Sequence, residues 1–339
     1  MSGNDLFSQQ LANRRRSALL VAGFVLLFAW IGFGGDLSWY LATRDAPDAA
    51  YRHLVPFLGL LSTTVAGGIA WYSWQRGAYR VLGATGAWEL LEPGDPAQQR
   101  LVNVVEEMAI ASGLPRPRIW IVPDPDPNAF ATGQGPGEAH LAVTSGLLAA
   151  LDRDELQGVV AHEMAHIRNL DVRLMTLLAA MVGTIALMSD TMQRFMGSGS
   201  RRRGGGKRDG RGGAPIAVLV FVLWLISLVV APLIARLLAM AVSRKREYLA
   251  DATAAQFTRN PEALARALAR IDGATESTKS IARGAAHMCI VDPAERRIAD
   301  REGALGDLFA SHPPMRLRIS RLKGMGYQFA KVAAGESVI

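Results

Sequence analysis

The sequence predicts a mostly helical α+β protein that is integral to a membrane, with up to four transmembrane helices and one water-exposed domain. Half of the 339 residues are hydrophobic, and they gather in uncharged runs long enough to cross a bilayer. A mixed segment of short strand and helix patterns separates the second run from the third. Within it, the helical stretch Val159–Asp171 carries two histidines four residues apart.

The first two uncharged runs predict an amino-terminal region, residues 1–80, with membrane spans at about 17–35 and 54–75. A signal peptide is the alternative for the first run, but its apolar region would be shorter and followed by a small-residue cleavage site. Basic residues precede the first run and follow the second, whereas the loop between them is mainly acidic. The positive-inside bias therefore predicts that the amino terminus and the chain after Arg76 face the cytoplasm.

Residues 81–172 form the first part of the water-exposed domain. Asp95–Pro96 predicts the start of a helix that ends at Gly113. Three strand patterns follow, at Ile119–Val122, at Asn128–Gly133 (an irregular edge strand) and at His140–Val143. Asp152 and Glu155 form a capping-box pattern just before the histidine helix, so that helix has a clear start.

Residues 173–239 predict a hydrophobic hairpin with apolar runs at about 174–189 and 214–235. Between them, residues 197–213 are mostly Gly, Ser and Arg, and this composition predicts a disordered linker. If both runs cross the membrane, the basic linker lies outside, against the positive-inside bias. If the short first run does not cross, the bias is kept, and the sequence leaves both topologies open. Residues 240–339 complete the discontinuous cytoplasmic domain.

His162 and His166 lie on one face of the predicted helix and can therefore bind a single metal ion. Glu163 is placed to take a proton from a water molecule at that ion. An amphipathic helix with two surface histidines is the alternative. However, the neighbouring residues are apolar, and burying this cluster without a bound ion would be costly. A catalytic zinc site needs three protein ligands, so a third must come from elsewhere in the chain.

A third histidine six residues beyond the second is excluded, because position 172 is valine. Glu247 is the best candidate for the third ligand, since Asp251 follows four residues later on the same helix face and can orient a histidine. A charged collar beside the membrane, Arg244–Glu247, explains the same residues equally well. Spacing alone does not choose between these interpretations.

The net charge of +7 lies largely in short clusters beside apolar runs and in the Arg/Gly tract. This pattern is expected of a protein whose partner is a lipid bilayer, and it does not indicate a nucleic-acid partner. Cys289 is the single cysteine, so no intrachain disulfide can form.

The chain resembles the HtpX family, which are membrane-bound zinc metalloproteases induced by heat shock in bacteria and related to the CAAX prenyl proteases. The resemblance extends from about Gly83 to Leu322 and includes the two amino-terminal spans. It rests on the following motifs and residues: His162–His166 with Asn169 and Asp171, the flanking apolar runs, Ser243–Asp251 and Ser311–Pro313.

This resemblance implies a zincin-like domain with one Zn²⁺ per chain. His162, His166 and Glu247 would be the zinc ligands and Glu163 the general base. Asp251 would support the ligands from behind. The long Arg/Gly linker and the somewhat extended amino terminus differ from the family pattern.

The resemblance also implies a catalytic role for His312, which would help hold the tetrahedral intermediate. Asn128, Ala129 and Phe130 lie in the strand that resembles the family's substrate-binding edge. A turn explains each of these features as well, since His312 precedes two prolines and Asn128 follows Pro127.

The implied function is a multi-pass zinc endopeptidase of the bacterial plasma membrane with its active site facing the cytoplasm. Its expected substrates are unfolded, misfolded or damaged membrane proteins, and other membrane quality-control proteases are expected partners. Two alternatives stay open: a CAAX-type processing protease, and a non-catalytic membrane scaffold that binds zinc structurally.

Overall fold

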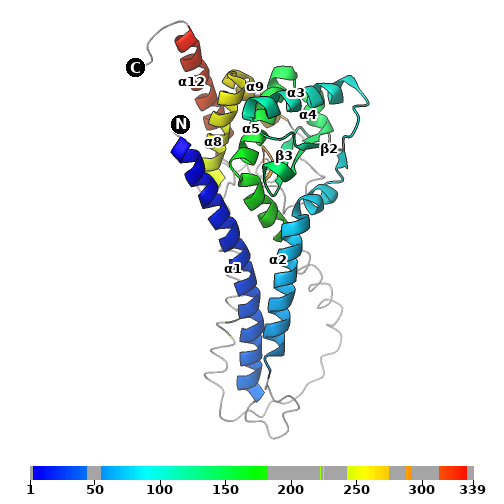
Figure 1. The fold of residues 1–339 in the computed structure, drawn as a ribbon, viewed down its shortest axis with the longest axis vertical. Coiled ribbons are helices and arrows are strands. Elements are labelled where there is room, and N and C mark those ends of the chain that lie inside the picture. The colour runs from blue at the N-terminus through cyan, green and yellow to red at the C-terminus, as the bar shows by residue number, and fades with distance from the viewer. Residues whose placement is uncertain are drawn as a thin grey trace. The chain divides into compact units, whose positions relative to one another are not determined.

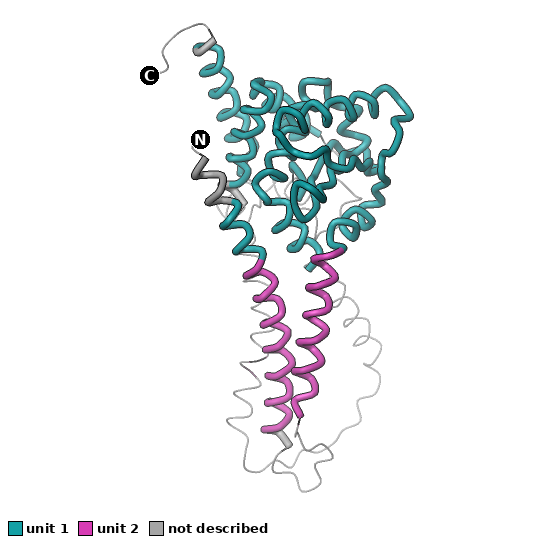
Figure 2. The backbone as a smooth tube through the Cα atoms, in the orientation of Figure 1, with its two compact units in different colours: residues 1–17, 76–183, 239–339 teal, residues 18–75, 184–238 magenta. Residues whose placement is uncertain are grey.

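The computed structural model is mostly helical with one small sheet, which confirms the predicted α+β class (Figure 1). The residues that it describes are 3–43, 55–181, 222, 224, 243–274, 288–291 and 313–333. The predicted linker 197–213 and most of the hairpin therefore lie outside the described residues. The chain forms two compact units, one with residues 1–17, 76–183 and 239–339 and the other with residues 18–75 and 184–238 (Figure 2).

The second unit contains most of helix α1, Gly3–Thr43, and of helix α2, Phe57–Ala84. The carboxylate of Asp36 accepts hydrogen bonds from the backbone N–H groups of Leu58, at 3.3 Å, and Gly59, at 2.7 Å. These donors belong to the first turn of α2 and have no partner within the helix. Asp36 therefore caps α2 and ties it to α1.

Among the described helices, one is long and apolar enough to cross a membrane, the stretch Gln10–Leu41 of α1. The predicted second span, residues 54–75, coincides largely with α2. The number of spans stays a prediction.

The first unit contains a four-stranded sheet in the order β1-β2-β4-β3. The strands are β1 Trp88–Glu89, β2 Arg118–Val122, β3 Ala129–Gly133 and β4 Ala139–Thr144. Strands β2 and β4 run parallel, and the other pairs are antiparallel. Strand β3 forms one edge, as its irregular pattern predicted. The two-residue strand β1 was not predicted.

Helices pack around this sheet in the same unit. They are α3 Pro96–Ser112, α4 Ser145–Ala150, α5 Arg153–Arg168, α8 Ser243–Thr258, α9 Pro261–Asp272 and α12 Met315–Ala333. The predicted caps are confirmed: Asp95 accepts a hydrogen bond from the start of α3, and Gly113 ends that helix in the left-handed conformation. Asp152 and Glu155 form the predicted capping box of α5.

Helix α5 is the central element of this unit, since it packs against α3, α8, α9 and β3. Its approach to α9 requires a glycine. A Cβ atom at Gly158 would lie 2.9 Å from both the Cα and the backbone nitrogen of Leu264. Because the clash is with backbone atoms, it can be relieved only by moving one helix away from the other.

We expect Gly158→Ala to destabilise the protein by about 1–3 kcal/mol, as overpacking of a dense core typically does. This loss should appear although alanine favours a helix by about 1 kcal/mol over glycine. Thermal unfolding of the detergent-solubilised protein measures the change. Gly137→Ala is the matched control, because a Cβ there meets nothing within 4 Å. A Gly158→Ala protein as stable as the wild type would contradict the close α5–α9 contact.

Candidate metal centre

The two histidines of α5 point their Nε2 atoms toward each other. His162 is buried and His166 is nearly so. Their Nε2 atoms lie 3.2 Å apart, and the ring planes are nearly perpendicular. The spacing arises because residues four apart stand one above the other on a helix. The predicted convergence of the two imidazoles is therefore confirmed.

Helix α8 brings Glu247 to the same point. Its Oε2 atom lies 3.6 Å from His162 Nε2, and its Oε1 atom lies 3.5 Å from His166 Nε2. Among the described residues, these three side chains form a group whose ligand atoms all lie within 4.8 Å of one another. Residues far apart in sequence thus meet in the way that the prediction required.

These distances suit a zinc ion. Zinc binds imidazole nitrogen and carboxylate oxygen at about 2.0–2.2 Å, so neighbouring ligands in a tetrahedron lie about 3.3–3.6 Å apart. The two Nε2 atoms, 3.2 Å apart, lie close to that range, and a different oxygen of Glu247 lies 3.5 or 3.6 Å from each of them. With one ligand atom from each residue, all three atoms lie within 4.8 Å of one another. Two histidines and one carboxylate form a donor set of known catalytic zinc sites, and three protein ligands leave the fourth position for water.

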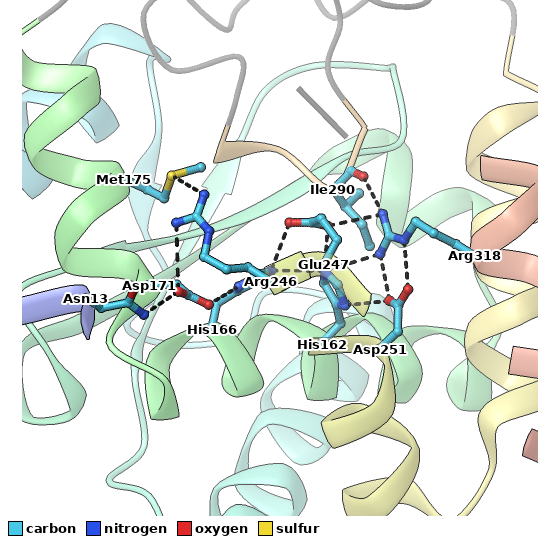
Figure 3. A network of polar contacts seen from close by, with 10 residues as sticks. All are labelled: Asn13, His162, His166, Asp171, Met175, Arg246, Glu247, Asp251, Ile290 and Arg318. Carbon is cyan, nitrogen blue, oxygen red and sulfur yellow. Dashed lines mark hydrogen bonds and ion pairs between the residues drawn. The ribbon is translucent and has the colours of Figure 1, made fainter. Parts of the chain in front are cut away.

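Each histidine has a carboxylate beside its other ring nitrogen. Nδ1 of His162 lies 3.0 Å from Oδ1 of Asp251, four residues beyond Glu247 on α8. Nδ1 of His166 lies 3.0 Å from Oδ2 of Asp171 (Figure 3). Such contacts fix the ring orientation and leave Nε2 as the atom that faces the metal.

Asp171 reaches His166 because the helix is interrupted just before it. Helix α5 ends with Asn169 as its cap, Leu170 adopts a left-handed conformation with φ of 59°, and a new helical stretch starts at Asp171. A non-glycine residue in that conformation costs about 1–2 kcal/mol. The change of direction turns Asp171 back toward the ring of His166.

Sequence reasoning missed Arg318 of α12, a fully buried arginine at the centre of this network (Figure 3). It donates to both carboxylate oxygens of Asp251, at 2.9 and 2.7 Å, and lies 3.3 Å from Glu247. The basic residues around it in α12 concealed this role. A usable pattern was present, since Arg318 stands four residues before the buried Leu322, on the apolar face of the helix.

These contacts shift the pKa values of the buried groups. Burial alone would raise the pKa of Asp251, but Arg318 and His162 hold it at about 2. Burial alone would lower the pKa of His162, but the neighbouring carboxylates of Asp251 and Glu247 raise it to about 9. Because a metal ligand must be neutral imidazole, metal binding displaces this proton.

Glu163 lies beside the ligand group, on α5, and is almost fully buried. Burial raises the pKa of its carboxyl, and the two neighbouring histidines oppose that rise. The backbone N–H of Ala131, on strand β3, is near enough to oppose the rise as well. This places a proton-accepting group between the ligand atoms and the edge of the sheet.

A cavity opens between the ligand group and strand β3. Its walls include Ala131, Met175, Met288, Cys289 and Ile290 beside the ligand atoms themselves. Residues 288–291 lie along the start of β3, where the N–H of Ile290 donates to the carbonyl of Ala129 at 3.0 Å. Alternation along an antiparallel pair then points the peptide groups of Ala129 and Ala131 away from β4, toward the cavity side.

The side chains of the predicted substrate-binding residues Asn128 and Phe130 are buried rather than exposed at the cavity. Asn128 is buried, and its side chain links the N–H of Ala129 to the carbonyl of Val291. Phe130 is buried in a hydrophobic cluster, and its peptide group faces β4. His312 lies outside the described residues.

Known proteins show similarity along most of the chain. The pattern of peptidase family M48 matches residues 96–326, more than half of the chain. A "Protease HtpX homolog" of Caldanaerobacter subterraneus subsp. tengcongensis is 36% identical, over 96% of this chain and 99% of the relative. One of Streptococcus gordonii is 35% identical over 94% and 100% of the two chains. One of Tropheryma whipplei is 45% identical over 68% and 74%.

A solved structure, that of S. mikatae Ste24p, aligns with 94% of this chain and 66% of its own, at 16% identity and a TM-score of 0.42. The family match covers the two histidines, Glu163, Glu247 and Arg318, and two of these HtpX homologues align over nearly the full length. The chain belongs to peptidase family M48.

Proposed function

We propose that this chain is a zinc-dependent endopeptidase of the bacterial plasma membrane that cleaves misfolded or damaged membrane proteins. One observation carries the proposal: His162, His166 and Glu247 converge on one point, with the buried carboxyl of Glu163 beside it. The similarity to proteins named HtpX protease homologues supports the bacterial membrane setting. The apolar stretch Gln10–Leu41 of α1 supports a membrane anchor.

In this proposal, each side chain has a separate task. His162, His166 and Glu247 would hold the zinc ion, which, when bound, polarises the scissile carbonyl and lowers the pKa of water. Glu163 would accept the proton of the attacking water and deliver it to the leaving amine nitrogen. A raised pKa helps both steps, because a stronger base accepts the proton and the acid form persists long enough to return it.

The charged residues that contact the ligands would fix the orientation of the ligand side chains. Asp251 and Asp171 hold the two imidazole rings, and Arg318 holds Asp251. His312 would stabilise the negative charge that develops on the carbonyl oxygen, a role that rests on the family resemblance alone.

Glu163→Gln should keep zinc near one ion per chain but lower cleavage of unfolded casein by about 100-fold or more, the scale of general-base catalysis. Glu247→Ala should lose both zinc and activity, because it removes a ligand. Metal analysis and peptide-release assays on the purified protein measure these outcomes. Glu106→Gln is the control, since this glutamate is exposed and pairs only at the surface with Arg116.

The outcome also separates the rival functions. If Glu247→Ala kept its zinc and its activity, another acidic residue would be the third ligand. A zinc-loaded wild type that cleaved no protein would favour the non-catalytic scaffold. Structural zinc sites normally have four protein ligands, whereas the group found among the described residues has three. Cleavage restricted to prenylated carboxyl termini would favour the CAAX-type alternative.

Substrate would be held as an added strand on the edge of the sheet. A protease that clears unfolded proteins needs a feature that all extended chains share, and main-chain hydrogen bonds supply it. Residues 288–291 already lie against Ala129, and the N–H of Gly133 donates to the hydroxyl of Thr176. The stretch around Ala131, between them, is the proposed binding edge. A strand paired there would run next to Glu163, because Ala131 and Glu163 line the same cavity.

Single N-methylation along a model peptide substrate tests this binding mode without altering the enzyme. Methyl groups at residues that pair with β3 should lower kcat/KM by about 2- to 12-fold each, the worth of one backbone hydrogen bond. Methyl groups at the alternate residues should be tolerated, because strand peptide groups point alternately to either side. A uniform response at all positions away from the scissile bond would contradict strand addition.

The proposed topology places the metal centre in the cytoplasm and the loop between the first two spans outside. In intact cells, a membrane-impermeant thiol reagent should label Ala49→Cys, whereas Ile110→Cys, on the exposed face of α3, should react only after permeabilisation. Cys289 is replaced by serine in both proteins. Labelling of Ile110→Cys in intact cells would contradict the orientation. Ser200→Cys, in the predicted linker, then decides between the two hairpin topologies.

A further inference from the structure

The amino-terminal end of α1 contacts the turn that carries Asp171. Asn13 is 4% exposed, although the arginines that follow it are exposed. Residues 1–17 belong to the same compact unit as the metal centre. The apolar stretch Gln10–Leu41 is about 48 Å long as a helix, longer than the roughly 30 Å core of a bilayer. Its first turns can therefore extend into the catalytic unit.

Both amide hydrogens of Asn13 are used. Its Nδ2 donates to the carbonyl of Asn169, at 2.9 Å, and to Oδ1 of Asp171, at 2.7 Å. Its Oδ1 accepts a hydrogen bond from Arg16, at 3.4 Å. These partners fix the orientation of the amide, because reversing it would turn the carbonyl oxygen toward a carboxylate and another carbonyl.

The other oxygen of the same carboxylate holds a proposed metal ligand. Oδ2 of Asp171 lies 3.0 Å from Nδ1 of His166, while Oδ1 receives Asn13 (Figure 3). Arg246 is more distant, with 3.8 Å between its Nη1 and Oδ1 of Asp171. Of these three contacts with Asp171, the one from Asn13 is the shortest, and it comes from outside the helices of the metal centre.

We propose that Asn13 is a positioning residue for the metal centre, which acts through Asp171 to orient the imidazole of His166. This inference rests on the proposed zinc site. A carboxylate held on one oxygen keeps its other oxygen in the ring plane of the histidine, and such outer contacts tune metal affinity. A residue near the amino terminus of the predicted membrane helix thereby helps to orient a metal ligand.

Simple docking of α1 on the turn is the competing explanation, and the chain offers a matched control for it. Gln10, one helical turn before Asn13, donates to the carbonyl of Arg168 at 2.8 Å. It contacts the same turn but does not touch Asp171. Gln10→Ala therefore removes a docking bond of similar length and leaves the carboxylate contact in place.

The test measures zinc affinity of the full-length protein in detergent by competition with a chelator. Asn13→Ala should weaken zinc binding by about 10-fold, the lower end of the effect of losing an outer contact. Gln10→Ala should change it less than about 2-fold. The absorption bands of the Co²⁺-substituted protein should shift in Asn13→Ala and not in Gln10→Ala, since they report ligand geometry. Thermal unfolding of the metal-free proteins confirms that both variants fold.

A double-mutant cycle shows whether the effect passes through Asp171. In an Asp171→Ala background, Asn13→Ala should cause no further loss of zinc affinity, because the contact is already absent. The inference would be overturned if Asn13→Ala and Asp171→Ala lowered zinc affinity independently of each other. Equal losses of zinc affinity in Asn13→Ala and Gln10→Ala would also overturn it. A wild type that binds zinc and cleaves casein, together with an Asn13→Ala protein of unchanged affinity and spectrum, would refute this inference alone. A wild type that binds no zinc would refute the proposed function.

Discussion

The structure depends on the convergence of two imidazoles and a carboxylate inside a packed core. Among the described residues, four carboxyl groups are buried around this point, those of Glu163, Asp171, Glu247 and Asp251, together with two guanidinium groups, those of Arg246 and Arg318. Once a bound ion has displaced the proton of His162, and with all four carboxyls ionised, two negative charges remain for the ion to balance. Buried charges are costly unless they are compensated, and a divalent cation supplies the missing charge. The charge balance is therefore compatible with a divalent ion at this point.

This requirement explains why α5 is so heavily packed. The helix must hold His162 and His166 in place, and its neighbours must bring Glu247 and Arg318 to the same side. Gly158 lets α9 approach closely, and the contacts of α8 and α12 then fix the position of their charged residues. The site is rigid because each of its members lies on a packed helix rather than on a loop.

Local patterns predicted much of this arrangement. Helix caps and the histidine spacing depend on residues a few positions apart, so Asp95, Asp152 and the histidine pair could be identified from sequence. Glu247 needed the family resemblance, because a charged collar explained the same residues equally well. Arg318 and Asn13 were missed for another reason. Their roles depend on contacts with residues that are 67 or more positions away in the sequence. Each also lies among other polar residues, so its sequence neighbours give no sign of a special role.

The break between α5 and the next helical stretch connects these observations. A helix that ends leaves backbone carbonyls without partners, and those of Arg168 and Asn169 receive Gln10 and Asn13 of α1. The left-handed Leu170 is strained, but its side chain is buried, and the conformation directs Asp171 toward His166. A continuous helix would have satisfied the same carbonyls by itself and would have carried Asp171 past the ring. The strained turn therefore creates both the contact that holds His166 and the exposed carbonyls to which the amino-terminal helix binds.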